Sequence, residues 1–92
     1  MATYKRTFSS GSKQVSAGND IIQIIDPDGS NANIQFLHFQ TFDKPCSIKL
    51  NGENTIHWID MNSEFIISDL YIGKITIVDA GVTYYYTAMS ID

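Results

Sequence analysis

Apolar and polar residues alternate along much of this chain, in short runs that end at turn-forming residues. In Cys46–Leu50, for example, Cys46, Ile48 and Leu50 are apolar and the residues between them are polar. Because successive side chains of a β-strand point to opposite faces, this alternation predicts a strand with one buried face.

The final segment, Val82–Ile91, has the same period and is also predicted to be a strand. Its two faces carry, respectively, Tyr84, Tyr86 and Ala88, and Tyr85, Thr87 and Met89. The other predicted strands are Asp20–Asp26, Asn33–Phe42, Thr55–Ile59, Phe65–Ile67 and Leu70–Asp79, together with Ala2–Ser10, which fits either a strand or a docking arm.

Two of these strands, Asp20–Asp26 and Asn33–Phe42, are apolar on both faces. That pattern predicts burial between two sheets or beneath a partner subunit, and we expect Asp20–Asp26 in the middle of a sheet. In Leu70–Asp79, Gly73 suggests a β-bulge. Trp58 in Thr55–Ile59 is expected to be a core anchor, because one large buried aromatic residue supports most small sandwiches.

Turn signals separate the strands. Ser9–Gly18 is small and polar and predicts a loop, and Asp26–Ala32 combines Asp, Pro and Gly in a strong turn pattern. Asn51-Gly52 is the pair preferred in type I′ hairpins. Ser68-Asp69 is expected to interrupt a strand.

Short strands with tight turns predict an all-β fold: a single antiparallel β-sandwich, jelly-roll-like, or a small barrel. The 92 residues fit one domain, residues 1–92, in which residues 1–18 form an N-terminal arm and flexible loop. Met61–Leu70 also has apolar residues near helical spacing, but its short length and its Ile-Ile pair favour a strand.

Charge is scarce in this chain. Charged residues make up 17% and aromatic residues 12%, whereas about 25% of a typical soluble domain is charged. Surfaces poor in charge and rich in Tyr and Trp are typical of protein interfaces and carbohydrate sites. The net charge of −4 disfavours binding to nucleic acid or to an anionic membrane, both of which attract basic surfaces. The first ten residues have no signal-peptide pattern, so we expect synthesis in a cytoplasm.

No catalytic motif is present, and we expect neither enzyme activity nor a cofactor. Cys46, the lone cysteine, is expected to be a core residue. His38 and His57 are the only histidines and predict no metal centre. Asp26–Asn31 imitates the start of a calcium loop, but Leu37 occupies the position of the last ligand, so only a weak calcium site there stays open.

The segment Cys46–Asp92 resembles the C-terminal β-modules of small tailed-bacteriophage virion proteins, including capsid decoration, head-fibre and tail accessory proteins. The residues that carry the resemblance are Ile67, Leu70, Ile72, Lys74, Ile75, Ile77, Ala80, Gly81, Val82, Tyr84 and Tyr86. The resemblance implies a β-sandwich that forms homo-oligomers, with a trimer favoured. It also implies capsid or tail proteins as partners, and a place in the virion after synthesis in the host cytoplasm.

Two hypotheses follow. In the first, the chain is a non-enzymatic structural subunit that decorates or joins a phage virion, with Tyr84, Tyr86, Trp58 and His38 as interface residues. In the second, it is a small carbohydrate-binding module in which Trp58, Tyr84 and Tyr86 stack on a glycan. The sequence leaves open the head or tail position, the oligomer number and the binding of a glycan.

Overall fold

The computed structural model describes residues 6–25, 29–30, 32 and 34–90. These residues form nine strands and contain no helix. The strands are β1 (Arg6–Ser9), β2 (Gln14–Ala17), β3 (Asp20–Ile22), β4 (Ile34–Thr41), β5 (Cys46–Leu50), β6 (His57–Ile59), β7 (Glu64–Ile72), β8 (Ile75–Ile77) and β9 (Ala80–Ser90). Asp26–Asp28 and Asn31 of the candidate calcium loop lie outside the described residues.

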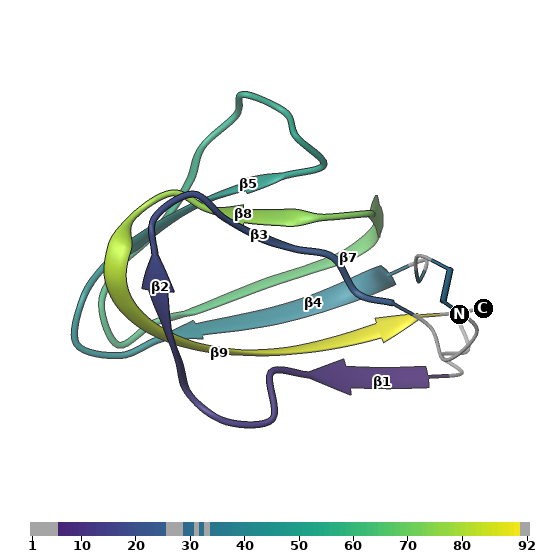
Figure 1. Cartoon of the computed structure of the whole chain (residues 1–92), viewed down its shortest axis with the longest axis horizontal. Helices are drawn as coiled ribbons and strands as arrows, with labels where there is room; N and C mark the ends of the chain where they lie inside the picture. The colour runs from purple at the N-terminus through teal and green to yellow at the C-terminus, as the bar shows by residue number, and fades with distance from the viewer. Residues whose placement is uncertain (1–5, 26–28, 31, 33, 91–92) are drawn as a thin grey trace.

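The strands form two antiparallel sheets that pack face to face (Figure 1). Sheet A has the order β1-β9-β4-β7, with β2 also paired to β9, and sheet B has the order β3-β8-β5-β6. If β1 and β2 count as two segments of one strand, the first strand pairs with the last, the second with the last but one, and so on inward. This nested pairing is that of a jelly roll, so the predicted all-β sandwich is confirmed.

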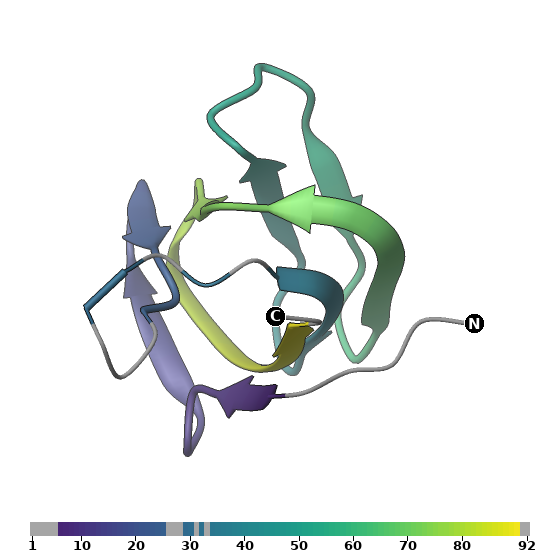
Figure 2. The same cartoon turned by 90° about the vertical axis from the view of Figure 1, so that its right-hand side faces the viewer.

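The core lies between the sheets, and Figure 2 shows the strands arranged around it. Alternate residues of each strand supply it, as the period of two requires. In β5 these are Cys46, Ile48 and Leu50, as predicted from their alternation. The other buried apolar side chains are Ile24, Ala32, Ile34, Leu37, Phe39, Ile59, Ile72, Ile75, Ile77, Val82, Tyr84 and Ala88.

The position predicted for Asp20–Asp26 is wrong. Its strand, β3, is three residues long and lies at the edge of sheet B rather than in the middle. Ile21 is 61% exposed because it faces away from the core and no further strand covers it. By contrast, β4 occupies the centre of sheet A, between β9 and β7.

The loop predicted for Ser9–Gly18 contains β2, a short strand beside β9. Ser16 stabilises this strand: its Oγ donates a 2.6 Å hydrogen bond to the Asp79 carbonyl and accepts a 3.0 Å bond from the Val82 N–H. These partners lie more than sixty residues away. Local composition therefore carried no sign of this strand.

The break predicted at Ser68-Asp69 is a bulge inside one continuous strand, β7. Asp69 has a φ of 61°, and the pairing of β4 with β7 shifts beside it. The chain turns instead at Gly73, between β7 and β8, where a bulge was expected. The strand also excludes the helical alternative for Met61–Leu70.

The predicted Asn51-Gly52 turn forms, with φ values of 57° and 72° and a 3.0 Å hydrogen bond from Glu53 N to the Leu50 carbonyl. The Asn51 side chain also binds the turn between β7 and β8. Its Oδ1 accepts a 2.6 Å bond from Gly73 N, and its Nδ2 donates a 2.8 Å bond to the Tyr71 carbonyl. Two neighbouring turns are therefore held together by one side chain.

Thr41 connects the two sheets. It is completely buried at the end of β4, and its Oγ1 donates a 2.5 Å hydrogen bond to the Asp60 carbonyl and accepts a 3.0 Å bond from Ser63 N. Asp60 and Ser63 flank the turn that carries the chain from β6 in sheet B to β7 in sheet A. The hydroxyl therefore fixes the point where the chain crosses between sheets.

We predict that Thr41→Val lowers the free energy of unfolding by about 1–2 kcal/mol, because it removes the buried hydroxyl that bonds two partly buried backbone groups, at nearly constant volume. Urea denaturation monitored by circular dichroism measures the change. Thr87→Val, which faces outward on β9, is the matched control and should change stability by less than about 0.5 kcal/mol. Equal effects of the two substitutions would contradict the role assigned to Thr41.

Candidate functional site

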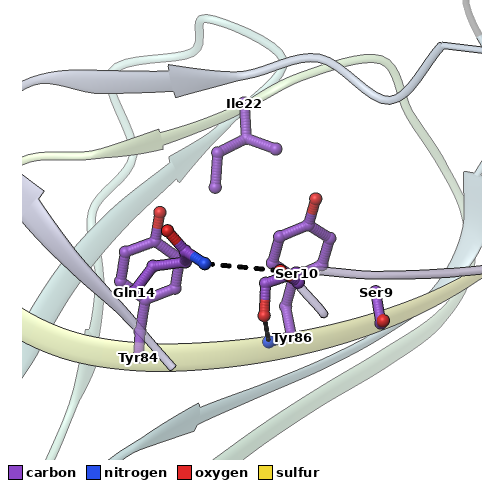
Figure 3. Close-up of a pocket in the computed structure, with 6 residues that line it drawn as sticks. All are labelled: Ser9, Ser10, Gln14, Ile22, Tyr84 and Tyr86. Carbon is purple, nitrogen blue, oxygen red and sulfur yellow. Dashed lines mark hydrogen bonds between the residues drawn. The ribbon is translucent and has the colours of Figure 1, made fainter. Parts of the chain in front are cut away.

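A solvent-open cavity of about 310 Å³ lies where the connection between β1 and β2 crosses β9. We call it the tyrosine cavity. Its lining residues are Ser9, Ser10, Gln14, Ile22, Tyr84 and Tyr86. Figure 3 shows the hydroxyl groups of Tyr84 and Tyr86 pointing to the same side, toward Ile22.

The period of β9 places both tyrosines in the cavity. Tyr84 and Tyr86 are two residues apart, so they share the inner face of the strand. The Tyr84 ring is 6% exposed and stacks on Phe39, with ring centres 5.4 Å apart and planes 11° from parallel. Tyr86 packs against the edge of the core. Core packing thus holds the two phenol rings in position.

Hydrogen bonds hold the opposite wall. Ser10 N donates to the Tyr86 carbonyl at 3.1 Å, and Tyr86 N donates to Ser10 Oγ at 3.3 Å. Gln14 Nε2 lies 3.4 Å from the Ser10 carbonyl and 3.2 Å from Ser12 Oγ, and donates to both. The Ser10 bonds join the connection between β1 and β2 to β9, and the Gln14 bonds hold the connection itself in shape. The shape of the cavity is therefore set by the fold.

The tyrosine hydroxyls are protonated at neutral pH. Burial raises the pKa of Tyr84, and the negative charge of Asp20 raises it further. Burial also raises the pKa of Tyr86. Among the described residues, neither hydroxyl has a hydrogen-bond partner within the protein. Both groups are therefore available to donate to, and accept from, a molecule in the cavity.

The four residues predicted as an interface separate into three places. Tyr84 and Tyr86 meet in the tyrosine cavity, His38 lies on the outer face of sheet A, and Trp58 lies on the outer face of sheet B. The expectation that Trp58 anchors the core is wrong, since it is 63% exposed. Ile59 occupies the buried position of β6 instead, which leaves its neighbour Trp58 on the solvent side.

The outer face of sheet A is large and nearly uncharged. It consists of Thr7, Val15, Phe36, His38, Gln40, Glu64, Ile66, Ser68, Thr83, Tyr85, Thr87 and Met89. Of these residues Glu64 alone carries a formal charge at neutral pH. Its Oε1 lies 3.4 Å from His38 Nε2, a contact that becomes an ion pair when the imidazole is protonated.

The outer face of sheet B is more divided. Ile21 and Trp58 are exposed, but they belong to β3 and β6, which are the two opposite edges of the sheet. Lys49 and Thr76 lie on the strands between them. The apolar residues of this face are therefore separated by a charged and a polar residue.

Cys46 lies in the core and is poorly placed to react. Burial, with a smaller contribution from the charge of Asp79, raises the pKa of its thiol to about 11. A thiol that stays protonated is a poor nucleophile. Among the residues that the structure describes, no group of three His, Cys, Asp or Glu side chains is arranged to hold a metal ion.

Sequence reasoning missed Ser9, Ser10, Gln14 and Ile22 as parts of a site. The first three lie in the segment predicted to be a flexible loop, and Ile22 was predicted to be buried within a sheet. The first three reach the cavity because β1 and β2 pair with β9, and Ile22 reaches it on β3, which pairs with β8. No local pattern marks such a pairing.

Comparisons of the chain with protein-family models, with curated proteins and with solved structures find no match. In the described part of the chain there is no helix that is long and apolar enough to cross a membrane.

We predict that a thiol reagent labels folded Cys46 at least about 100-fold more slowly than the urea-unfolded chain at pH 8, because a pKa raised from 9.0 to about 11 lowers the thiolate fraction by that factor. Labelling with a chromogenic disulfide measures both rates. Similar rates in the two states would contradict the burial of the thiol.

The same pKa shift predicts a loss of stability in alkali. Above about pH 9 the unfolded thiol ionises, while the folded thiol stays protonated until about pH 11. The unfolded state then binds fewer protons, so the free energy of unfolding falls as pH rises through this range. Cys46→Ala should have a shallower slope between pH 9 and 11 in urea denaturation. An unchanged slope would contradict this assignment.

Proposed function

We propose that this chain is a non-enzymatic structural subunit that associates with copies of itself through the outer face of sheet A and takes part in the assembly of a phage virion. The observation that carries the proposal is the scarcity of charge on that face: among the described residues assigned to it above, Glu64 alone carries a formal charge. In a sheet with one face in water, the residues of that face are normally polar and charged, while the apolar residues point to the core.

The composition of this face fits a protein interface. Its centre holds Phe36, Met89 and Tyr85, and Ile66 at its edge is 58% exposed. Aromatic residues and Met are enriched in interface centres, whereas Glu and Lys are depleted. The face is four strands wide: β1 with β2, then β9, β4 and β7. With strands about 4.8 Å apart and about 24 Å long, its projected area is roughly 450 Å². That is more than half of the roughly 800 Å² that each partner buries in a standard interface.

A second copy is the occupant that the chain itself favours. A single domain of this size buries a limited core, so subunit contacts add stability that it otherwise lacks. The resemblance of Cys46–Asp92 to phage virion modules favours a trimer, with capsid or tail proteins as further partners. Jelly rolls recur in viral capsid domains, which supports this role by analogy of fold.

Size-exclusion chromatography with light scattering tests the association. We predict an oligomer, with a trimer favoured, for the unmodified chain. Ile66→Lys should shift it to a monomer, because it places a charge inside the proposed interface. Trp58→Lys is the matched control: it replaces an equally exposed apolar residue on the opposite sheet and should leave the mass unchanged.

Two results would contradict the proposal. A monomer at high concentration would rule out self-association of the unmodified chain. Dissociation by Trp58→Lys but not by Ile66→Lys would move the interface to sheet B. Mass spectrometry of purified particles, from a phage that carries this gene, tests the virion assignment separately.

A further inference from the structure

We propose that the tyrosine cavity binds a neutral saccharide, as one sugar unit of a larger glycan or as a free monosaccharide or disaccharide. This site is distinct from the proposed assembly face, since the inner and outer residues of β9 point to opposite sides of sheet A. The inference therefore does not depend on the association of subunits.

The polar groups of the cavity match a polyol. Tyr84 and Tyr86 present two hydroxyls that have no partner among the described residues. Gln14, Ser9 and Ser10 also line the cavity. The Ser10 Oγ is already engaged, donating to the Ser12 carbonyl and accepting from Tyr86 N, and the Ser9 Oγ accepts from Gly11 N. Hydroxyl and amide groups both donate and accept hydrogen bonds, as the hydroxyls of a sugar do. A ligand without such groups would leave the tyrosine hydroxyls unsatisfied.

Core packing does not explain the Tyr84 hydroxyl. The ring stacks on Phe39 and the residue is almost fully buried, so phenylalanine would pack equally well at this position. The hydroxyl instead faces the solvent-open cavity, and it is not among the buried polar atoms that lack a partner. In the cavity, a ligand hydroxyl can therefore take the place of water as its hydrogen-bond partner.

The apolar part of the cavity and its size also suit a sugar. Ile22 lies above the two phenol groups (Figure 3) and offers an apolar surface to the C–H groups of a pyranose ring. The volume of about 310 Å³ is at the small end of the roughly 300–1,000 Å³ found for ligand pockets. Because the cavity is open on one side, a longer glycan can continue into solvent.

The charges around the cavity select against anions. None of its lining residues is charged, and Asp20 lies close enough to Tyr84 to raise the pKa of the phenol. Lys13 is the basic residue of the β1–β2 connection, and its Nζ is held 4.1 Å from the centre of the Phe42 ring. A phosphate or carboxylate in the cavity would therefore meet a negative charge without a lining cation. The proposed ligand is neutral for this reason.

The cavity is also preorganised. Two hydrogen bonds between Ser10 and Tyr86 set one wall, and the Phe39–Tyr84 stack sets the other. Binding then requires little reordering of the protein, which lowers the entropic cost of association.

Two-dimensional ¹H–¹⁵N NMR titration of the full chain tests this inference. The probes are the methyl glycosides of glucose, galactose and mannose, and N-acetylglucosamine. Galacturonic acid and N-acetylneuraminic acid serve as anionic counterparts. We expect at least one neutral sugar to cause saturable shifts at Ser10, Gln14, Ile22 and Tyr86, and the anionic sugars to bind at least about tenfold more weakly.

Tyr86→Phe should lower the affinity for the sugar by about 3- to 10-fold, because it removes one hydrogen-bonding hydroxyl and keeps the ring. Tyr85→Phe is the matched control: it removes the same group from the neighbouring residue, which lies on the opposite face of β9, and it should leave affinity unchanged. The reference spectrum of each variant reports directly whether it is folded.

Four results would overturn the inference: no saturable shift with any neutral sugar, tighter binding of the anionic sugars, equal weakening by both substitutions, or shifts that centre on exposed Trp58 instead of the cavity. Ile66→Lys separates this inference from the assembly proposal. It should retain sugar binding as a monomer, because Ile66 lies on the outer face. If Ile66→Lys is a monomer and still binds the sugar, the result supports sugar binding in the tyrosine cavity independently of the assembly proposal.

Discussion

The alternation of side chains along β9 is the constraint on which the rest of the molecule depends. This eleven-residue strand pairs with β1, β2 and β4, so it holds most of sheet A together. Its inner residues supply Val82, Tyr84 and Ala88 to the core. Its outer residues supply Tyr85 and other members of the assembly face. One strand therefore builds the core, the cavity wall and the proposed interface at once.

The fold could be predicted wherever burial follows from local pattern. Cys46, Ile48 and Leu50 alternate with polar neighbours, and they are buried as expected. Prediction failed at the sheet edges, where exposure depends on strand order rather than on composition. Ile21 and Trp58 are as apolar as core residues, yet β3 and β6 are the last strands of sheet B and their outer faces meet solvent.

The candidate site could be predicted in part. The spacing of Tyr84 and Tyr86 places them on one face, and both line the cavity. Their neighbours in the cavity are brought by pairings between the two ends of the chain, such as Ser10 with Tyr86 and Ser16 with Val82. Such pairings depend on the closure of the whole jelly roll, and a small polar segment contains no local signal for them.

The shared use of β9 also limits how this protein can change over generations. Inserting or deleting one residue within the strand would exchange inward and outward side chains on one side of the change, unless a β-bulge absorbed it. The core, the cavity and the outer face would then be disrupted together. Substitutions at alternate positions, in contrast, alter one surface and leave the other intact. The length of this strand should therefore be far more constrained in descendants than the identity of its outward residues.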